Sequence, residues 1–224
     1  MGRCDVALFF NYARINRAIG ASQFDAHLDA LFGEKELARL RSELPGAGED
    51  VFRREDLVLD ALEQALRGIG AKFFLPYRFR MPDGRTSHHL VFVTTKRMGY
   101  DTMKKSMARF SAKTHDDIPM FEFVQGTPRS EQLSFLDIQT LTPPRHFPFS
   151  VRQLADTIYN RYRGRKIGLV NVFDAMNVGT PYVLKNFKDA AIDLRARTLA
   201  TLVRSTTGVA PKANQCPDDT EIIL

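Results

Sequence analysis

The chain has 224 residues, of which 44% are hydrophobic and 26% charged, a globular composition long enough for one full core plus a small second domain. The net charge of +6 favours contact with a polyanion. The two cysteines, Cys4 and Cys216, exclude a disulfide scaffold or clustered zinc site and make the cytosol the expected compartment. The apolar run at residues 6–10 is too short and too soon followed by arginines for a signal peptide or membrane span.

That run, residues 6–10, predicts a strand buried on both faces of a parallel sheet. Such a strand needs neighbours on both sides, so the pattern suggests a truncated or split α/β protein. The next segment, residues 11–17, reads as a polar loop at the carboxyl end of the strand, where open α/β sheets bind ligands. The candidate cleft residues are Asn11, Tyr12, Arg14, Asn16 and Arg17. The two arginines could hold a phosphate, and Asn11 could bond a base or an amide.

The rest of the first half alternates between helical and strand patterns. Apolar spacing and capping residues predict helices over 22–33, 35–44 and 49–68. Residues 72–80 and 87–95 predict an antiparallel hairpin, because Pro82-Asp83-Gly84 between them favours a turn. A helix around 100–110 and a strand at 120–124 follow, and the proline-rich stretch over 126–149 reads as a linker.

The last third, residues 150–224, has the order of a winged helix-turn-helix domain. Ser150 is the expected N-cap of a first helix, a second helix runs near 169–176, and Thr180 with Pro181 is expected to open a third. Residues 198–203 and 221–224 then supply two strands around a loop rich in Gly, Pro and Asn. Three helices followed by a two-stranded wing is the order of that fold.

Basic residues and one asparagine in this domain are candidates for nucleic-acid contact. They are Arg161, Arg163, Arg165 and Lys166 after the first helix, Lys185, Asn186 and Lys188 on the face of the third that we expect to be exposed, and Lys212 in the wing. Asp189 and Asp193 on the third helix would repel a phosphate backbone, so docking of a protein or a purely structural role stays open. His88 and His89 point to opposite faces of a strand and cannot share a metal. No catalytic motif is evident in the sequence.

Several short motifs, in order, resemble the C-terminal half of the three-Cys-motif partner (TcmP) family. They are Cys4 to Arg17, the hairpin from Phe74 to Phe92, the helix start Gly99 to Lys104, and Thr180-Pro181-Tyr182. The resemblance extends over nearly the whole chain. It implies a class I methyltransferase-like α/β domain followed by a winged helix, acting beside a radical-SAM-like protein that bears the three cysteines.

On this resemblance the fold class is α/β, with a partial doubly wound sheet that ends in an antiparallel hairpin. The domains would be an incomplete methyltransferase-like domain over 1–125, the linker over 126–149 and the winged helix over 150–224. The family's glycine-rich loop and ribose-binding acid have no counterpart here, so we expect S-adenosylmethionine to bind only if a missing N-terminal half complements the chain. Two alternatives stay open: a stand-alone winged-helix regulator or adaptor, and a weak methyltransferase with a separately encoded cofactor domain.

Overall fold

The computed structural model describes residues 5–111, 114–125 and 148–224, and the chain divides into two compact units. The first unit comprises Met1–Lys104 and Glu122–Arg145, and the second comprises Lys105–Phe121 and His146–Leu224. The second unit therefore includes a segment that the sequence places in the first domain, 1–125. Most of the expected linker, 126–149, lies outside the described residues.

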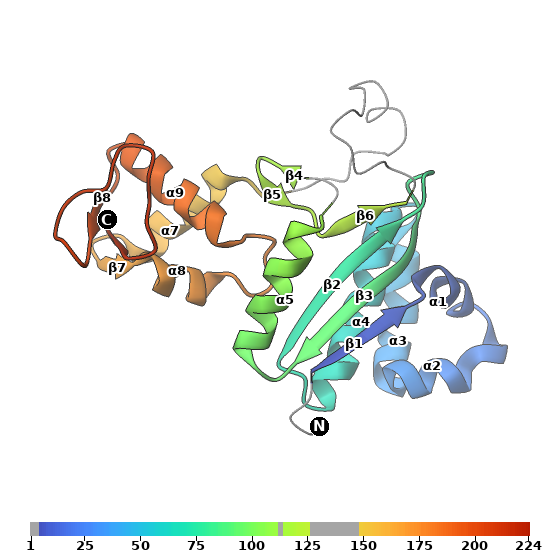
Figure 1. Ribbon diagram of the computed structural model, residues 1–224. Coiled ribbons are helices and arrows are strands. Elements are labelled where there is room, and N and C mark those ends of the chain that lie inside the picture. The colour runs from blue at the N-terminus through green and yellow to red at the C-terminus, as the bar shows by residue number, and fades with distance from the viewer. Residues whose placement is uncertain (1–4, 112–113, 126–147) are drawn as a thin grey trace. The chain divides into compact units, whose positions relative to one another are not determined.

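The first unit is built on a four-stranded mixed sheet in the order β1-β3-β2-β6 (Figure 1). Its strands are β1 (Val6–Phe10), β2 (Phe73–Arg80), β3 (Thr86–Thr94) and β6 (Glu122–Val124). Strand β3 runs antiparallel to β1 and β2, which confirms the predicted hairpin, and β6 runs parallel to β2. The carboxyl ends of β1, β2 and β6 therefore meet at one edge, which we call the carboxyl edge of the sheet.

The prediction that residues 6–10 form a strand buried on both faces of a parallel sheet is wrong. In the described sheet β1 is an edge strand, and it is antiparallel to β3. The side chains of Val6 and Phe9 are 36% and 62% exposed, whereas Phe10 is buried. All five residues of β1 are apolar, so the sequence lacks the polar alternation that normally identifies a strand with one solvent-facing side.

The prediction of a loop over residues 11–17 is wrong, because helix α1 (Tyr12–Ala18) occupies this segment. The Oδ1 atom of Asn11 accepts a hydrogen bond of 3.0 Å from the backbone N–H of Arg14. This N-cap satisfies one of the amide groups that the start of a helix otherwise leaves unpaired. The helix is only two turns long and carries two arginines, so its apolar periodicity is weak in the sequence.

Three further helices pack on one face of the sheet (Figure 1). They are α2 (Asp25–Phe32), α3 (Glu34–Glu43) and α4 (Val51–Gly68), with single turns η1 (Ser22–Phe24) and η2 (Leu44–Ala47) before and after the first two. These confirm the predicted helices, and α4 begins where the carboxylate of Asp50 accepts hydrogen bonds from two backbone amides. Val58 and Leu62 of α4 share a buried core with Phe74 and Val91 of the sheet.

The opposite face of the sheet receives the first turns of α5 (Arg97–Arg109). Phe73 precedes Phe74, and successive strand residues point to opposite faces, so Phe73 points away from the core of α2–α4. Its ring centroid lies 5.4 Å from that of Tyr100 on α5, and Tyr100 is 1% exposed. The predicted helix is thus confirmed, and it begins at Arg97, three residues before Tyr100.

The second unit combines three helices with a three-stranded antiparallel sheet in the order β7-β9-β8. In chain order these are α7 (Val151–Tyr162), β7 (Lys166–Gly168), α8 (Leu169–Met176), α9 (Leu184–Ala196), β8 (Thr201–Arg204) and β9 (Thr220–Ile223). Its core is fully closed, because Ile158, Phe187, Leu194 and Ile222 are each 0% exposed. Helices α7 and α8 and the last two strands are as predicted, α9 begins later than predicted, and β7 was not predicted.

A short hairpin, β4 (Thr114–His115) and β5 (Ile118–Pro119), also belongs to the second unit and was not predicted. Ile118 is 0% exposed and lies in the core of this unit. Asp116 at the turn accepts a hydrogen bond of 2.9 Å from the backbone N–H of Val151, at the start of α7. The hairpin is therefore an integral part of the unit.

The expected N-cap role of Thr180 is also wrong. Helix α9 begins at Leu184, where the backbone N–H of Val183 donates to Oδ1 of Asn186 at 2.9 Å. The hydroxyl of Thr180 instead donates to the carbonyl of Asn177, 3.0 Å away at the end of α8. Thr-Pro therefore ends one helix here, which follows from the ability of threonine to bond carbonyls as well as amides. Within the described parts of the chain, no helix combines the length and apolarity needed to cross a bilayer.

Candidate functional site

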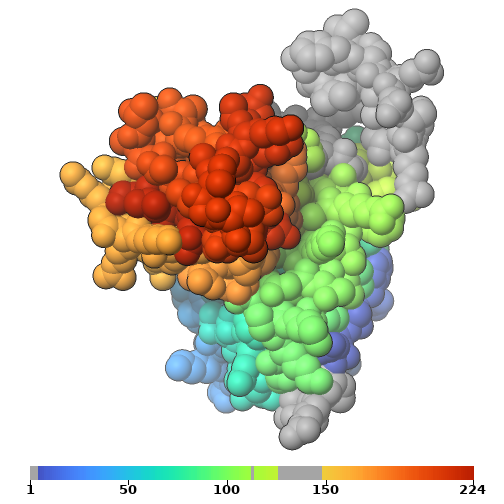
Figure 2. Space-filling model, turned by 60° about the vertical axis from the view of Figure 1, so that its left-hand side comes forward, coloured from blue at the N-terminus to red at the C-terminus, as the bar shows by residue number. Residues whose placement is uncertain are grey.

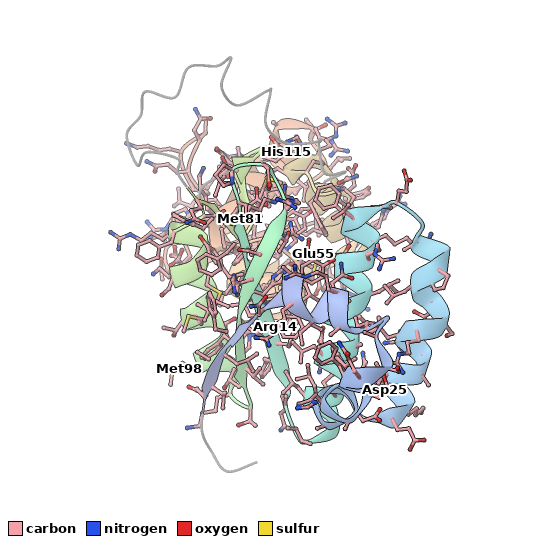
Figure 3. The ribbon with its side chains drawn as sticks, turned by 90° about the vertical axis from the view of Figure 1, so that its right-hand side faces the viewer. Arg14, Asp25, Glu55, Met81, Met98 and His115 are labelled. Carbon is pink, nitrogen blue, oxygen red and sulfur yellow. The ribbon has the colours of Figure 1, made fainter. Side chains whose placement is uncertain are left out.

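The residues predicted to form a cleft after β1 do not share one environment. Asn11, Arg14 and Arg17 are exposed, Asn16 is half-buried, and Tyr12 is only 4% exposed. Figure 3 shows Arg14 on α1, close to the carboxyl edge of the sheet. The described structure thus leaves three of the five residues facing solvent and turns Tyr12 inward.

A network of buried charges lies between α4 and the sheet, beside Tyr12. At its centre is Glu55 of α4, which is 0% exposed and points toward the sheet (Figure 3). Its carboxylate accepts a hydrogen bond of 2.8 Å from the hydroxyl of Thr86, lies 2.9 Å from Nε2 of His89, and forms an ion pair with the guanidinium of Arg78. The rings of Tyr12 and His89 meet edge to face, with centroids 6.0 Å apart.

The register of the sheet explains why these groups meet. His89 of β3 is paired with Arg78 of β2, and Arg78 is paired with Glu122 of β6. Paired residues point to the same face, so the three polar side chains form a row on the face that α4 covers. Arg80, two residues along β2, adds an ion pair of 3.0 Å between its Nε and Glu122 Oε2.

The carboxylate of Glu55 is held in its ionised form. Burial by itself raises the pKa of Glu55, but the hydrogen bond and charge of His89, together with the charge of Arg78, lower it to about 2. Burial and the nearby Glu55 carboxylate raise the pKa of Tyr12 to about 12, so its hydroxyl stays neutral. That hydroxyl is buried and has no hydrogen-bond partner within the described residues.

The network positions the carboxyl edge of the sheet and is closed to solvent. The side chains of Glu55, Arg78, Arg80 and Glu122 are each no more than 6% exposed, so a dissolved ligand does not reach them. An ion pair of this kind is costly to break, because removing one partner leaves the other charged and buried. We therefore assign the network a structural role beneath the surface at which a ligand would bind.

A methyltransferase-like fold implies S-adenosylmethionine, and the described residues at the carboxyl edge do not fit it. Nucleotide cofactors bind where a strand enters a helix through a glycine-rich turn, because glycines let the backbone approach the ligand. Here β1 enters α1 through Asn11, whose carbonyl accepts from the N–H of Ile15 at 3.0 Å and whose side chain caps the helix. Both polar groups are thus used by the helix. Among residues 5–111, 114–125 and 148–224, no group of three or more His, Cys, Asp or Glu side chains is placed to hold a metal ion.

On α9 of the second unit, the predicted nucleic-acid contacts are already engaged. Lys185 Nζ lies 2.7 Å from Asp117 in the β4–β5 turn, and this hydrogen bond raises the pKa of Lys185. Lys188 Nζ pairs with Asp218 at 2.5 Å. The expectation that Asn186 is exposed is wrong: it is 0% exposed, and its amide donates to the carbonyl of Asp117 at 3.0 Å.

The turn after α7 presents a different surface. Arg161, Arg163 and Arg165 are exposed, and none of them forms an ion pair with another described residue. The guanidinium carbon of Arg161 lies 5.6 Å from the ring centroid of Tyr162, and that of Arg163 lies 5.7 Å from the ring of Tyr159. The tyrosines thus support two of the three cations.

The backbone of this turn is fixed by the end of the chain's last strand. The N–H of Gly164 donates to the carbonyl of Leu224 at 3.0 Å, and the N–H of Leu224 donates to the carbonyl of Arg165 at 3.1 Å. Gly164 has a φ of +75°, a conformation that glycine adopts without strain. We call Arg161, Arg163 and Arg165 the arginine turn. The neighbouring Lys166 differs from them, because its Nζ pairs with Glu221 at 2.8 Å.

Lys212 lies in the exposed loop between β8 and β9, which reaches the surface of the second unit (Figure 2). Its carbonyl accepts a hydrogen bond of 3.2 Å from Arg195 of α9, which ties the loop to the helix. No family model, curated protein or solved structure matches the chain.

Proposed function

We propose that the protein is a nucleic-acid-binding scaffold in which a methyltransferase-like sheet carries a winged helix. In this proposal it is the C-terminal part of a three-Cys-motif partner-like protein and is not catalytic alone. Binding of S-adenosylmethionine would then require a complementing half that supplies the glycine-rich loop.

The connectivity of both units supports this fold assignment. A class I methyltransferase-like sheet ends in a strand inserted antiparallel between its neighbours, and β3 lies between β1 and β2 and opposes both. In the second unit, helix, strand, helix, helix and two strands follow one another, and the sheet order is β7-β9-β8. That arrangement is the one a winged helix requires, with the β8–β9 loop as its wing.

The observation that carries the functional proposal is the arginine turn. The second unit contains 14 Lys and Arg against 9 Asp and Glu, so it holds +5 of the chain's net charge of +6. Within it, the cations of α9 face carboxylates, whereas the arginine turn presents three guanidinium groups on a fixed backbone. Arginine donates several hydrogen bonds in a planar geometry that matches phosphate oxygens. Contact with the nucleic-acid backbone through this turn is therefore favoured over reading of bases by α9.

The proposal predicts a salt-dependent affinity that the arginine turn supplies. We consider a variant with Arg161, Arg163 and Arg165 all changed to Gln. Its slope of log association constant against log salt concentration is expected to become less negative by about 2–3, because each lost phosphate contact removes about one unit of slope. Fluorescence anisotropy with labelled duplex and single-stranded oligonucleotides over a series of salt concentrations measures this. The matched control changes Lys185 and Lys188 to Gln, which removes cations already paired with Asp117 and Asp218. An arginine variant with the slope of the unaltered protein would contradict the proposal.

A second candidate function is docking of a partner protein on α9. The specific observation in its favour is the alternation of charge on this helix, where Asp193 pairs with Arg197 at 3.0 Å and Lys188 with Asp218 at 2.5 Å. Such a neutralised surface repels neither an acidic nor a basic protein, and the proposed partner is a radical-SAM-like protein with three cysteines. A stand-alone regulator or adaptor would use the same helix without that partner.

Charge reversal distinguishes partner docking from nucleic-acid contact. The change Asp189→Lys adds two positive charges to this balanced surface and is expected to weaken co-purification with the co-expressed three-cysteine partner, since like charges brought together at an interface cost free energy. The same change adds a cation and should leave nucleic-acid affinity equal or higher. Co-purification that is unaffected by Asp189→Lys would count against docking on α9.

A further inference from the structure

An open row of aromatic rings crosses the first unit's sheet at the carboxyl edge, on the face opposite the buried charges. His88 of β3 is paired with Phe79 of β2, and Phe79 with Phe123 of β6. These residues are sequence neighbours of the charged row, and alternation in a strand therefore puts them on the other face. Phe9 of β1 completes the row. We call Phe9, Phe79, His88 and Phe123 the aromatic platform.

The rings of the platform are in mutual contact. Phe9 and His88 stack, with centroids 4.7 Å apart and planes inclined by 25°. The ring of Phe79 lies 5.6 Å from Phe9 and 6.0 Å from Phe123, tilted by 57° and 56° respectively. Phe9 is 62% exposed and Phe123 is 40% exposed, so both ends of the row face solvent. An exposed aromatic cluster of this extent on a protein surface is a feature of binding sites.

The platform lines a shallow depression of about 290 Å3, together with Arg80, Ser87 and Gln125. This volume lies at the lower end of the range found for small-molecule sites. The described lining has no aliphatic side chain and no carboxylate. Arg80 contributes to it without its guanidinium, which is buried on the other face and pairs with Glu122. The hydroxyl of Ser87 donates to the carbonyl of Phe79 at 3.1 Å and keeps its oxygen as an acceptor.

This lining fits a flat ring with polar edges better than an apolar protein segment. A helix that docks in a hydrophobic groove buries its apolar face there, whereas the described lining sets a hydroxyl and an amide beside its rings. A base offers a π-face to phenylalanine and histidine, and its edge has donors and acceptors for an amide and a hydroxyl. The lack of a lining carboxylate also suits a ligand that carries phosphate.

We propose that the aromatic platform stacks an unpaired base of single-stranded nucleic acid. Bases within a duplex have both faces covered by their neighbours, so the platform selects single strands. The inference uses residues of the first unit alone and is independent of the arginine turn. It therefore goes beyond the proposed function, which concerns backbone contact by the second unit.

The test compares three phenylalanine variants of the full chain. Phe9→Leu removes the ring but keeps an apolar side chain at an exposed position, so folding should be retained. Phe9→Trp keeps a stacking ring and supplies a fluorophore in a chain that contains no tryptophan. Phe110→Leu is the matched control, since Phe110 is 56% exposed and lies outside the platform.

The probe is a labelled single strand of about 12 nucleotides, with an abasic strand of the same length and the corresponding duplex as comparisons. Phe9→Leu is expected to weaken single-strand binding about five- to a hundredfold, the effect of losing one stacked base, and to leave the salt slope and duplex affinity unchanged. Phe9→Trp should bind like the unaltered protein, with fluorescence quenched by the single strand and not by the abasic one.

The outcomes separate this inference from the proposed function. If Phe9→Leu binds single strands as tightly as Phe110→Leu does, the platform proposal is overturned, whatever the arginine variant does. Equal affinity for abasic and normal strands overturns it as well. Competition by a free nucleoside monophosphate at the affinity of the whole strand would assign the platform to a small molecule and reject the polymer. Loss of the salt slope in the arginine variant bears only on the proposed function.

Discussion

Replacing Glu55 with leucine is expected to lower the free energy of unfolding by about 3–5 kcal/mol, the range for a buried ion pair that loses one partner. The change leaves the guanidinium of Arg78, which is 6% exposed, with only the more distant carboxylate of Glu122 at 3.6 Å, and it removes the acceptor for the hydroxyl of Thr86. The cost comes from the charge that remains buried, and not from the intrinsic strength of the pair. Urea denaturation followed by circular dichroism measures the difference.

Two further variants test whether burial of the charge is the cause. Glu63→Leu alters the same helix at a more exposed carboxylate, whose pair with Arg67 at 2.6 Å is expected to be worth at most about 1 kcal/mol. The double change of Glu55 and Arg78 to leucine removes both charges and should be less destabilising than Glu55→Leu alone. If Glu55→Leu lowers the free energy of unfolding by less than about 1 kcal/mol, the loss of this carboxylate does not leave a costly buried charge on Arg78.

The sequence predicts most helices and strands of both units because their apolar periodicity and capping residues are strong. Helix α4 illustrates this, since Asp50 caps it and its apolar positions recur at helical spacing. The β2–β3 hairpin is equally evident from its Pro-Asp-Gly turn. Pairing between distant segments is not evident from the sequence, so the third strand β7, the edge position of β1 and the β4–β5 hairpin were missed.

The buried charges were missed for a different reason. Glu55 lies three residues before Val58 and seven before Leu62, so it shares the buried face of α4, and Arg78 and Arg80 alternate on one side of β2. An acidic residue on the apolar face of a helix, together with two arginines on one face of a strand, could have predicted a buried network of ion pairs. Which partners meet depends on the register that places His89 beside Arg78, and the sequence does not specify that register.

Local environment also separates the eight predicted nucleic-acid contacts into two groups. Charge alone does not distinguish Lys188 from Arg163, yet one faces Asp218 and the other rests on Tyr159. The platform residues are apolar or weakly polar, so a search for cations passes over them. Their role depends on four strands bringing Phe9, Phe79, His88 and Phe123 to one face, which only the fold reveals.

Acid is expected to destabilise the protein through Glu55 more than through exposed carboxylates. The pKa of Glu55 is lowered from 4.5 to about 2 in the folded state, so its contribution is fully present above about pH 4.5. As pH falls through this window toward 2, the unfolded chain takes up the proton first and stability is lost. The difference between the two pKa values of Glu55 corresponds to about 3 kcal/mol of free energy of unfolding, at about 1.4 kcal/mol for each pKa unit.

The variant Glu55→Gln isolates this contribution. Glutamine keeps the shape of the side chain and can still accept from Thr86, but it has no proton to bind in this window, so its free energy of unfolding should vary less with pH between about 4.5 and 2. Urea midpoints at several pH values measure both slopes. Identical slopes for Glu55→Gln and the unaltered protein would mean that Glu55 is protonated to the same extent folded and unfolded. The ion pair with Arg78 and the contact with His89 would then not stabilise the carboxylate, and the buried network could not be what fixes the carboxyl edge beneath the aromatic platform.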